Sequence, residues 1–341
     1  MKLSKAAAKA SEGCLDCHRE PDDPLKFPDG SKLSVAIDAK AYKASAHGAK
    51  LGCQDCHRSI SDHPHPKVGA RNARAYRVAA SEMCKRCHYA YYTRSLDGIH
   101  FKQLASGNGK APTCIDCHDA HRMRSPRKVR AEIPKRCASC HEKVSKVYAL
   151  SVHGKALARA SSAKDVPSCT DCHGAHRNLD PKTQGARAKV HELCGKCHSD
   201  KKRMKRYGLS ANVYSTYLDD FHGRSNALYA RGAGKAKKPM ASCVSCHGVH
   251  DIRRFKEPGQ KHALRARVLT VCKKCHEKAT PNFADAWLSH YQPTLASAPL
   301  VWLVDWAYKL LVPFIISALV LHILLHLYRL RRRKSSVRRS S

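Results

Sequence analysis

The chain has 341 residues, of which 43% are hydrophobic but only 6% aromatic, and its formal net charge is +36. So high a positive charge first suggests a nucleic-acid-binding protein, because clustered Lys and Arg are the electrostatic footprint of phosphate recognition. The scarcity of aromatic residues and the negative mean hydropathy argue against an ordinary core of apolar side chains.

The cysteines all belong to one recurring pattern, Cys-x-x-Cys-His. Nine copies use all eighteen cysteines, so none remains for a disulfide or a nucleophile. The pattern is the signature of covalent c-type haem attachment, in which two thiols add to the porphyrin and the following His becomes the proximal iron ligand. A zinc array would instead need closed sets of four ligands. Numbered 1 to 9, the motifs supply thioether cysteines Cys14, Cys17, Cys53, Cys56, Cys84, Cys87, Cys114, Cys117, Cys137, Cys140, Cys169, Cys172, Cys194, Cys197, Cys243, Cys246, Cys272 and Cys275, and proximal ligands His18, His57, His88, His118, His141, His173, His198, His247 and His276.

Nine covalently bound haems c would change the interpretation of both composition and charge. With about 33 residues per haem over the first 300, the porphyrins must form most of the core, and the chain without haem should be largely unfolded. Two propionates per haem add about 18 negative charges, which Lys and Arg can pair with. We therefore expect no nucleic-acid partner. The remaining positive charge favours an acidic redox partner or an anionic membrane surface.

Residues 1–46 form an N-terminal segment that holds motif 1. The phrase before this motif, Ala-Ser11-Glu-Gly-Cys14, recurs as Ala-Ser81-Glu-Met-Cys84, so motif 1 resembles the second half of a two-motif unit. The first residues lack the apolar stretch of a secretory signal. Either a signal has been removed or the start codon is misassigned.

Residues 47–290 repeat a two-motif unit four times, and such self-similarity defines the architecture. Each unit opens with a His, and three units carry a further His three residues after the first proximal ligand. The unit at Cys53 lacks that residue and has His63 and His65 instead. The opening class comprises His47, His100, His153 and His222, with His290 as a fifth, and the second class comprises His121, His176 and His250.

These histidines, with one of His63 or His65, make nine candidates for the distal position on nine irons. We therefore predict coordination by two histidines throughout. A His three residues after a proximal ligand cannot reach the opposite face of the same haem, so that class must serve a neighbour. The opening His could serve the motif just after it or the second motif of the preceding unit. His191 and His262 do not recur and are expected at the surface or against propionates.

The segments between motifs predict short helices, at Arg71 to Ala80, Arg127 to Ile133, Lys182 to Val190 and His262 to Thr270, and little strand. The fold class is mainly α with much irregular coil: an elongated array of two-haem units followed by one C-terminal transmembrane helix.

The C-terminal part changes composition abruptly. Residues 291–309 form a juxtamembrane aromatic segment, residues 310–328 a transmembrane helix with Pro313 in its first turn, and residues 329–341 a basic tail. Trp287, Trp302 and Trp306 precede the apolar segment. By the aromatic-belt and positive-inside rules, the tail lies in the cytoplasm and the haem region faces the periplasm of a bacterial inner membrane.

Two histidines, His322 and His326, interrupt this apolar segment one helical turn apart. Ionisable groups inside a bilayer are costly and usually functional, and a spacing of four places both on one face. We expect them to form a membrane-side site that contacts an integral cytochrome b-like or quinone-reactive subunit. His326 could instead simply lie at the membrane interface.

From roughly residue 11 to residue 290 the motifs resemble the periplasmic multihaem cytochromes c with doubled Cys-x-x-Cys-His units, such as small tetrahaem cytochromes and decahaem conduits. The resemblance rests on the paired motifs and on the Cys-His-x-x-His phrases at His121, His176 and His250. It implies closely stacked haems in alternating parallel and perpendicular pairs. The C-terminal anchor departs from the N-terminally anchored quinol dehydrogenases and looks more like that of subunits working beside a cytochrome b.

Two functions follow from these expectations. The first is a membrane-anchored electron carrier of nine haems that links the quinone pool, or a cytochrome b partner, to periplasmic redox partners. The second is a multihaem reductase of nitrite, hydroxylamine or a sulfur oxyanion, which would need one five-coordinate haem. A Cys-x-x-Cys-Lys motif would have favoured the enzyme, but the chain has none, and nine distal candidates leave no iron open. We therefore expect an electron carrier without a catalytic residue.

Overall fold

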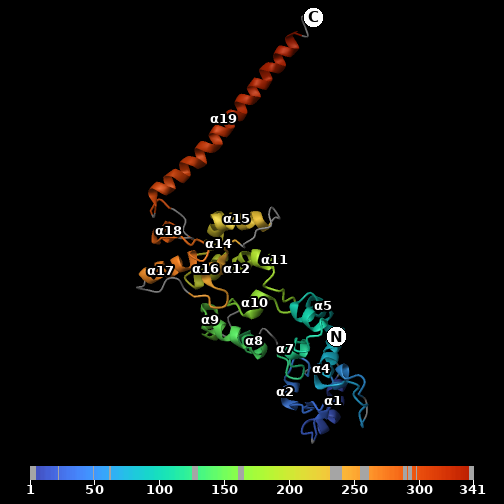
Figure 1. Cartoon of the computed structure of the whole chain (residues 1–341). Coiled ribbons are helices and arrows are strands. Elements are labelled where there is room, and N and C mark those ends of the chain that lie inside the picture. Colours follow the sequence, from blue (N-terminus) through green and yellow to red (C-terminus); the bar gives the residue numbers. More distant parts are fainter. Residues whose placement is uncertain are drawn as a thin grey trace.

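The structure is a computed structural model that describes residues 5–21, 23–48, 50–60, 63–124, 130–159, 165–230, 240–253, 261–286, 290, 294–296 and 298–337. Over these residues the chain is mainly helical. The elements form an elongated body that runs from α1 at one end to α15 and α18 at the other (Figure 1). Helix α19 extends from the α18 end, away from that body.

A two-stranded hairpin follows the first helix, α1 (Lys5–His18). Strands β1 (Leu25–Lys26) and β2 (Lys32–Leu33) pair antiparallel, with Leu25 opposite Leu33. Gly30 in the turn has a φ of +82°, a conformation that glycine adopts without a Cβ clash. These two short strands are the strands of the described residues, in agreement with the prediction of little strand.

The first motif of each unit starts a short helix. The residue before the first Cys is extended, and its backbone N–H donates to the side chain three positions later: Thr113 to Asp116 at 2.7 Å and Ser168 to Asp171 at 2.6 Å. This capping arrangement satisfies N–H groups that have no partner within the helix. The helices are α3 (Cys53–Cys56), α7 (Cys114–Cys117), α10 (Cys169–His173) and α16 (Cys243–His247).

The second motif of each unit instead lies at the end of a preceding helix or inside a longer one. Motif 1 at the end of α1 shares this placement, in agreement with its second-motif phrase. Inside α5 and α8 the proximal residues His88 and His141 depart from helical dihedrals, so the chain bends at the ligand. The elements concerned are α4 (Ala73–Ser81), η1 (Glu82–Cys84), α5 (Lys85–Leu96), η2 (Arg130–Glu132), α8 (Ile133–Leu150), α11 (Gln184–Ala188), α12 (Val190–His198) and α17 (Lys261–Cys272).

A Tyr and a Gly bracket three of the opening histidines. The Tyr lies five residues before the His, and its hydroxyl donates to the carbonyl two residues before the first Cys of the unit: Tyr42 to Leu51, Tyr148 to Pro167 and Tyr217 to Ala241, at 2.6–3.1 Å. A Gly directly follows the His. The backbone carbonyl of the same Tyr lies where the Cβ of any other residue at this Gly would be, as the Tyr148 carbonyl does at Gly154. The chain therefore turns tightly before each first motif. The helices around these turns are α2 (Ala39–Lys43), α6 (Ile99–Ala105), α9 (Val152–Arg159), α14 (Val213–Asp219) and α15 (Phe221–Ala230).

Neighbouring units are joined by a backbone hydrogen bond that repeats in one register. The donor is the backbone N–H of the residue just before an opening His. The acceptor is a carbonyl in the next unit, that of the residue two positions after the last His of Cys-His-x-x-His. The bonds run from Ala46 to Met123 at 2.7 Å, from Ile99 to Asn178 at 2.7 Å and from Val152 to Ile252 at 2.9 Å. Each unit thus packs against the next in the same way.

The apolar core of the described residues is small. Leu15, Leu157, Met204 and Tyr217 are among the few large apolar side chains that are buried, and serines such as Ser151 and Ser168 are buried equally deeply. A chain of this length would normally bury far more apolar surface. This agrees with the expectation that porphyrins supply most of the core.

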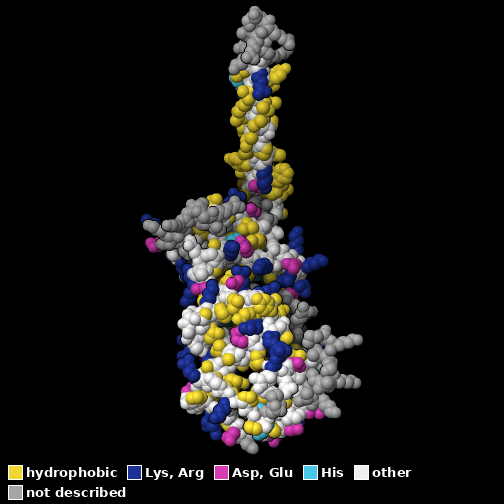
Figure 2. Space-filling view, turned by 90° about the vertical axis from the view of Figure 1, so that its right-hand side faces the viewer, with side chains coloured by type: hydrophobic (Ala, Val, Ile, Leu, Met, Phe, Trp, Pro, Cys, Tyr) yellow, Lys and Arg dark blue, Asp and Glu magenta, His cyan; other side chains and the backbone are white. Residues whose placement is uncertain are grey.

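The C-terminal helix α19 (Pro299–Val337) has 39 residues, which corresponds to about 58 Å. The most apolar 18-residue window of its span Pro299–Arg331 has a mean hydropathy of 2.5, and none of that window is buried. Figure 2 shows it as a column of hydrophobic side chains. Because the helix begins at Pro299, Pro313 lies inside it and not in its first turn, so that expectation was wrong. Trp302 and Trp306 lie on the helix, whereas Trp287 is outside the described residues.

The inter-motif helices expected from sequence are present as α4, α11 and α17, and the segment from Arg127 is described only from residue 130 onward. The remaining helices are α13 (Lys201–Arg206) and α18 (Pro281–Ala286), which lie on either side of the last unit's motifs in sequence.

Replacing Gly154 by Ala should destabilise the protein. A Cβ at this position would lie 2.1 Å from the Tyr148 carbonyl oxygen, so the turn before motif 6 must open. We expect a loss of about 3 kcal/mol, seen as a lower midpoint of guanidinium unfolding by circular dichroism. The control is Gly185→Ala in α11, where nothing lies within 4 Å of the added atom and helix propensity favours Ala. Equal midpoints for the two variants would contradict the structure.

Candidate functional site

Each proximal histidine faces one other imidazole at nearly constant distance. Across the described residues the ring centroids of these pairs are 5.8 to 6.3 Å apart, although the partners come from different segments. The pairs are His18 with His65, His57 with His121, His88 with His47, His118 with His176, His141 with His100, His173 with His250, His198 with His153, His247 with His290, and His276 with His222.

The pair at motif 6 shows how the rings are oriented. The Nε2 atoms of His173 and His250 face each other at 3.5 Å, while the ring centroids are 5.8 Å apart. The difference is roughly two ring radii, so the imidazoles point at each other end to end. Metal–imidazole bonds are about 2 Å long, so two axial ligands on one iron have centroids about 6 Å apart. The residues therefore fit a haem iron between them.

Backbone carbonyls orient two of these rings. The Nδ1 atom of His18 lies 2.9 Å from the carbonyl oxygen of Val35, and that of His47 lies 3.3 Å from the carbonyl of Ala120. An Nδ1–H group that donates to a carbonyl leaves the Nε2 lone pair free for a metal. Both rings thus present the nitrogen that faces the paired imidazole.

Burial keeps many of these imidazoles neutral. It lowers the pKa of His153 to about 4, with a further contribution from His198, and lowers the pKa of His247 to about 4, with contributions from His290 and His198. Only the neutral ring can offer a lone pair to iron. The surroundings thus favour the ligating form before any metal is considered.

The pairing differs from both schemes that the spacing suggested. Each opening His faces the second motif of its own unit, as His153 faces His198, and not the motif just after it or one in the preceding unit. The reason lies in the first motif, which turns toward the preceding unit: α10 packs on α8. The Cys-His-x-x-His residues face the first motif of the preceding unit, so that class does reach a neighbouring motif.

The two exceptions to the regular histidine spacing, His65 and His290, face motif 1 and motif 8. The structure places His65 opposite His18, and His63 lies beside His65 instead. At the other end His290, which we grouped with the opening histidines, faces the first motif of the last unit. Its φ of +69° is uncommon for a non-glycine residue.

Cysteines join consecutive units by contacts between equivalent residues. The first Cys of a second motif lies within hydrogen-bonding reach of the first Cys of the next motif in four places: Cys14 with Cys53, Cys84 with Cys114, Cys137 with Cys169 and Cys194 with Cys243. The proximal His of the second motif also lowers the pKa of the proximal His it meets in the next unit, after the larger effect of burial, as His18 does for His57. At each of these boundaries the first cysteines of the two motifs therefore lie close together, and so do their proximal histidines.

Within a unit the two motifs approach through the second Cys of the first motif. After burial, the neighbouring Cys197 raises the pKa of Cys172, and Cys272 and Cys275 raise that of Cys246. The same relation holds for Cys56 with Cys87 and for Cys117 with Cys137. Each motif is thus adjacent to the next in chain order, from motif 1 to motif 9.

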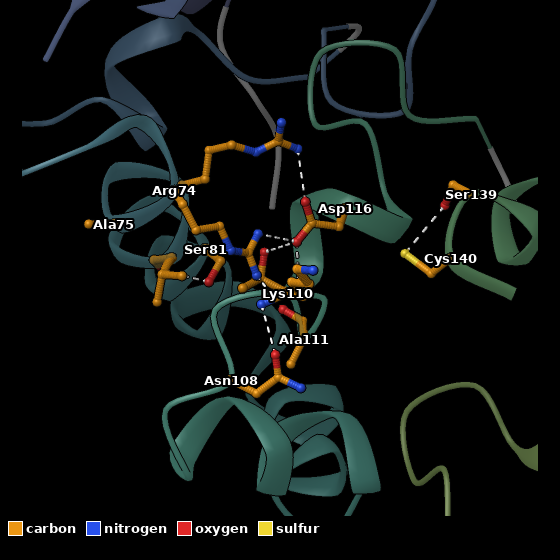
Figure 3. Close-up of polar contacts among 12 residues, drawn as sticks. Arg74, Ala75, Ser81, Asn108, Lys110, Ala111, Asp116, Ser139 and Cys140 are labelled. Atoms are coloured by element: carbon orange, nitrogen blue, oxygen red, sulfur yellow. Dashed lines mark hydrogen bonds and ion pairs between the residues drawn. The ribbon is translucent and has the colours of Figure 1, made fainter. Parts of the chain in front are cut away.

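Arginines secure the boundaries between units, a feature that the sequence analysis missed. Arg74 donates to the Asp116 carboxylate at 2.7 Å, and Arg77 does so at 3.0 Å (Figure 3). Although burial would raise the pKa of Asp116, these bonds and those from Thr113 hold it below its ordinary value. Arg130 reaches Asp171 in the same way at 2.6 Å. The missed signal is an Arg seven residues before the first Cys of every second motif: Arg77, Arg130, Arg187 and Arg265.

His191 is not at the surface, contrary to the expectation from sequence. Only 8% of it is exposed, its ring contacts those of Tyr214 and Tyr217, and its Nδ1 accepts from the Asn226 amide at 3.0 Å. It therefore holds α12, α14 and α15 together. The side chain of His262 lies outside the described residues.

Motif 9 borders an open cavity of about 370 Å³, which is lined by Cys275, His276, Glu277, Lys278, Ala279 and Phe283. The Phe283 ring lies 5.1 Å from that of His276. This open space beside a proximal His, with the Phe283 ring on one side, leaves room for a porphyrin face. His322 and His326 lie far along α19, exposed and away from the nine imidazole pairs.

The comparisons agree with this geometry. Residues 106–146 and 162–203 match the family model described as the doubled CXXCH motif. These segments contain motifs 4 and 5 and motifs 6 and 7, which are two of the four units. No curated protein and no solved structure matches the chain. The paired motifs indicate covalently bound haem c and support a multihaem c-type cytochrome, and the C-terminal apolar helix fits membrane anchoring.

Proposed function

We propose that the protein is a membrane-anchored cytochrome of nine haems, each held by two histidines, that transfers electrons between the quinone pool, or a cytochrome b partner, and periplasmic acceptors. The observation that carries this proposal is the set of nine imidazole pairs at one spacing. Each bound haem iron carries one electron as it alternates between the ferric and ferrous states.

The protein's own residues order this transfer. The cysteine contacts hold each motif against its neighbours in chain order, and ligands from adjacent units fix their relative positions. Because no proximal histidine of the described residues lacks a facing imidazole, the residues favour saturated irons over an open catalytic position. We therefore do not propose the reductase function.

The membrane end supports an orientation. Helix α19 carries Trp302 and Trp306 on the side of the motifs and a run of arginines, from Arg329, on the other. The positive-inside rule places such a run in the cytoplasm, which leaves the motifs in the periplasm. On this proposal an integral cytochrome b-like or quinone-reactive subunit contacts the face of α19 with His322 and His326 and passes electrons to the last unit.

The first test is haem content. Denaturing mass spectrometry of the mature protein should give the mass of the polypeptide plus nine haems, because all nine motifs carry both thiols and the His. A well-matured preparation with seven haems or fewer would contradict the proposal.

The second test concerns ligation at motif 1. His65→Ala should leave the iron at His18 with one axial imidazole and produce one high-spin ferric signal per protein by EPR. His63→Ala is the matched control, because its ring lies beside His65 but does not face His18. If His63→Ala gave the high-spin signal and His65→Ala did not, the assignment would be wrong.

The third test concerns the membrane helix. His322→Ala should slow reduction of the c-type haems by quinol in membranes about tenfold or more and reduce co-purification of the integral subunit, since a buried polar contact contributes about 1–2 kcal/mol in a membrane. Ser317→Ala, a polar residue one and a half turns earlier in the same helix, is the control. Unchanged rates for His322→Ala would make α19 only a tether.

A further inference from the structure

Tyr91 on α5 contacts imidazoles that belong to two adjacent motifs. Its ring centroid lies 4.9 Å from that of His176, which faces motif 4, and 6.2 Å from that of His88, the proximal residue of motif 3. The ring planes of Tyr91 and His176 are tilted by 41°, and rings at this distance are in contact. Tyr91 therefore lies where motif 3 meets motif 4.

The sequence around Tyr91 departs from that of the other units in a way that the contact explains. Units 1, 3 and 4 have a Tyr five residues before the opening His, but unit 2 has Ser95 in that place. In unit 1 this Tyr is Tyr42, whose ring lies 6.2 Å from that of His121, the residue that corresponds to His176 one unit later. Tyr91 lies one helical turn before Ser95 on α5. It thus supplies an aromatic contact that Ser95 cannot make.

The backbone beside this contact is fixed, but the ring of His176 has few other restraints. Ile99 donates to the carbonyl of Asn178 at 2.7 Å, which holds the chain on both sides of the contact. Among the described residues no hydrogen bond holds the His176 ring, whereas a backbone carbonyl orients that of His18. Neighbouring groups normally fix the orientation of an axial imidazole. For His176, Tyr91 is the group in a position to do so.

Arg94 in turn restrains the Tyr91 ring. Its guanidinium carbon lies 5.9 Å from the ring centroid, because residues three apart on a helix share one face. A cation over an aromatic face is attracted to it. Tyr91 is half-exposed, yet its ring is therefore in contact with both Arg94 and His176.

We propose that Tyr91 is a positioning residue for electron transfer, which fixes the ring plane of His176 and thereby the electronic state of the iron at motif 4. The rings of His118 and His176 are only 22° from parallel. The plane of an axial imidazole determines which iron d orbital holds the unpaired electron of the ferric state. This inference rests on the proposed function, because it needs haems at motifs 3 and 4. One electron passes from the ferrous iron at one of these motifs to the ferric iron at the other, and Tyr91 itself is not oxidised.

The test compares substitutions at Tyr91 by EPR of the full-length, haem-loaded protein in the ferric state. Near-parallel imidazole planes give a rhombic low-spin signal, whereas crossed planes move the signal to higher g. Tyr91→Leu should remove one haem equivalent from the rhombic signal, because the His176 ring is then free to rotate. Tyr91→Phe keeps the aromatic face and should retain the wild-type spectrum. An unchanged spectrum for Tyr91→Leu, or equal changes in the two variants, overturns the proposal.

Two further variants make the result specific. Tyr89→Leu is the matched control, because Tyr89 lies two residues earlier on α5 and its exposed ring contacts no imidazole of the described residues. The same loss of signal in Tyr89→Leu would reveal a general disturbance of α5 and contradict the assignment. Tyr91→Met replaces the flat ring by a flexible chain. It should show the same loss as Tyr91→Leu, and it decides the question if Tyr91→Leu does not load fully.

The haem content of each sample separates this inference from the proposed function. Denaturing mass spectrometry should give nine haems in the wild type and in each variant, and EPR should show no high-spin ferric signal, because every axial imidazole remains. Nine haems with an unchanged low-spin spectrum in Tyr91→Leu would remove the role of Tyr91 and leave the proposed function standing. A wild type with seven haems or fewer would instead contradict the proposed function.

Discussion

The structure is organised around one arrangement, in which each proximal histidine faces a second imidazole that its own motif does not provide. The chain achieves it by exchange between segments. The opening His of a unit serves the second motif of that unit, and the Cys-His-x-x-His residue reaches back to the unit before. Every unit is therefore incomplete by itself. The repeated backbone bonds from Ala46, Ile99 and Val152 hold adjacent units in the register that this exchange demands.

The same arrangement links folding to maturation. Among the described residues the buried apolar side chains are few, and the most deeply buried residues are serines: Ser151 donates to the Tyr148 carbonyl and Ser168 to the Asp171 carboxylate. Little apolar surface is thus buried without the porphyrins, and metal-binding free energy becomes folding free energy in such systems. Since the imidazole that faces the first motif of units 1 to 3 comes from the next unit, loss of a haem at one of these motifs should loosen both units. Stability and electron transfer then rest on the same bonds.

Sequence predicted the composition of the site well and its connections poorly. The nine motifs, both classes of distal candidates and the apolar helix follow from local patterns, because thioether attachment and membrane insertion each need a short, recognisable stretch. Which imidazole faces which motif does not follow from local patterns. It depends on how α10, and the helix of the first motif in the other units, packs on the preceding unit. Local spacing also failed for His191, whose burial arises from Tyr214 and Tyr217 on another helix.

Some missed features did leave a sequence signal. The Tyr five residues before an opening His, the Gly after it and the Arg seven residues before a second motif all recur, but their meaning is visible only once Tyr148 reaches Pro167 and Arg130 reaches Asp171. The exceptions are equally informative. Unit 1 has no His three residues after His57, and His65 of that unit faces motif 1 instead.

The arrangement of the last unit gives the membrane end a distinct character. His290, which faces motif 8, lies on the segment between α18 and α19, so the chain that leads to the membrane also carries an axial candidate. Its left-handed backbone conformation is one that a non-glycine residue adopts at some cost. The imidazole that faces motif 8 is thus carried by the segment that leads to the anchor, whereas the one that faces motif 1, at the far end, comes from coil after the first motif of unit 1.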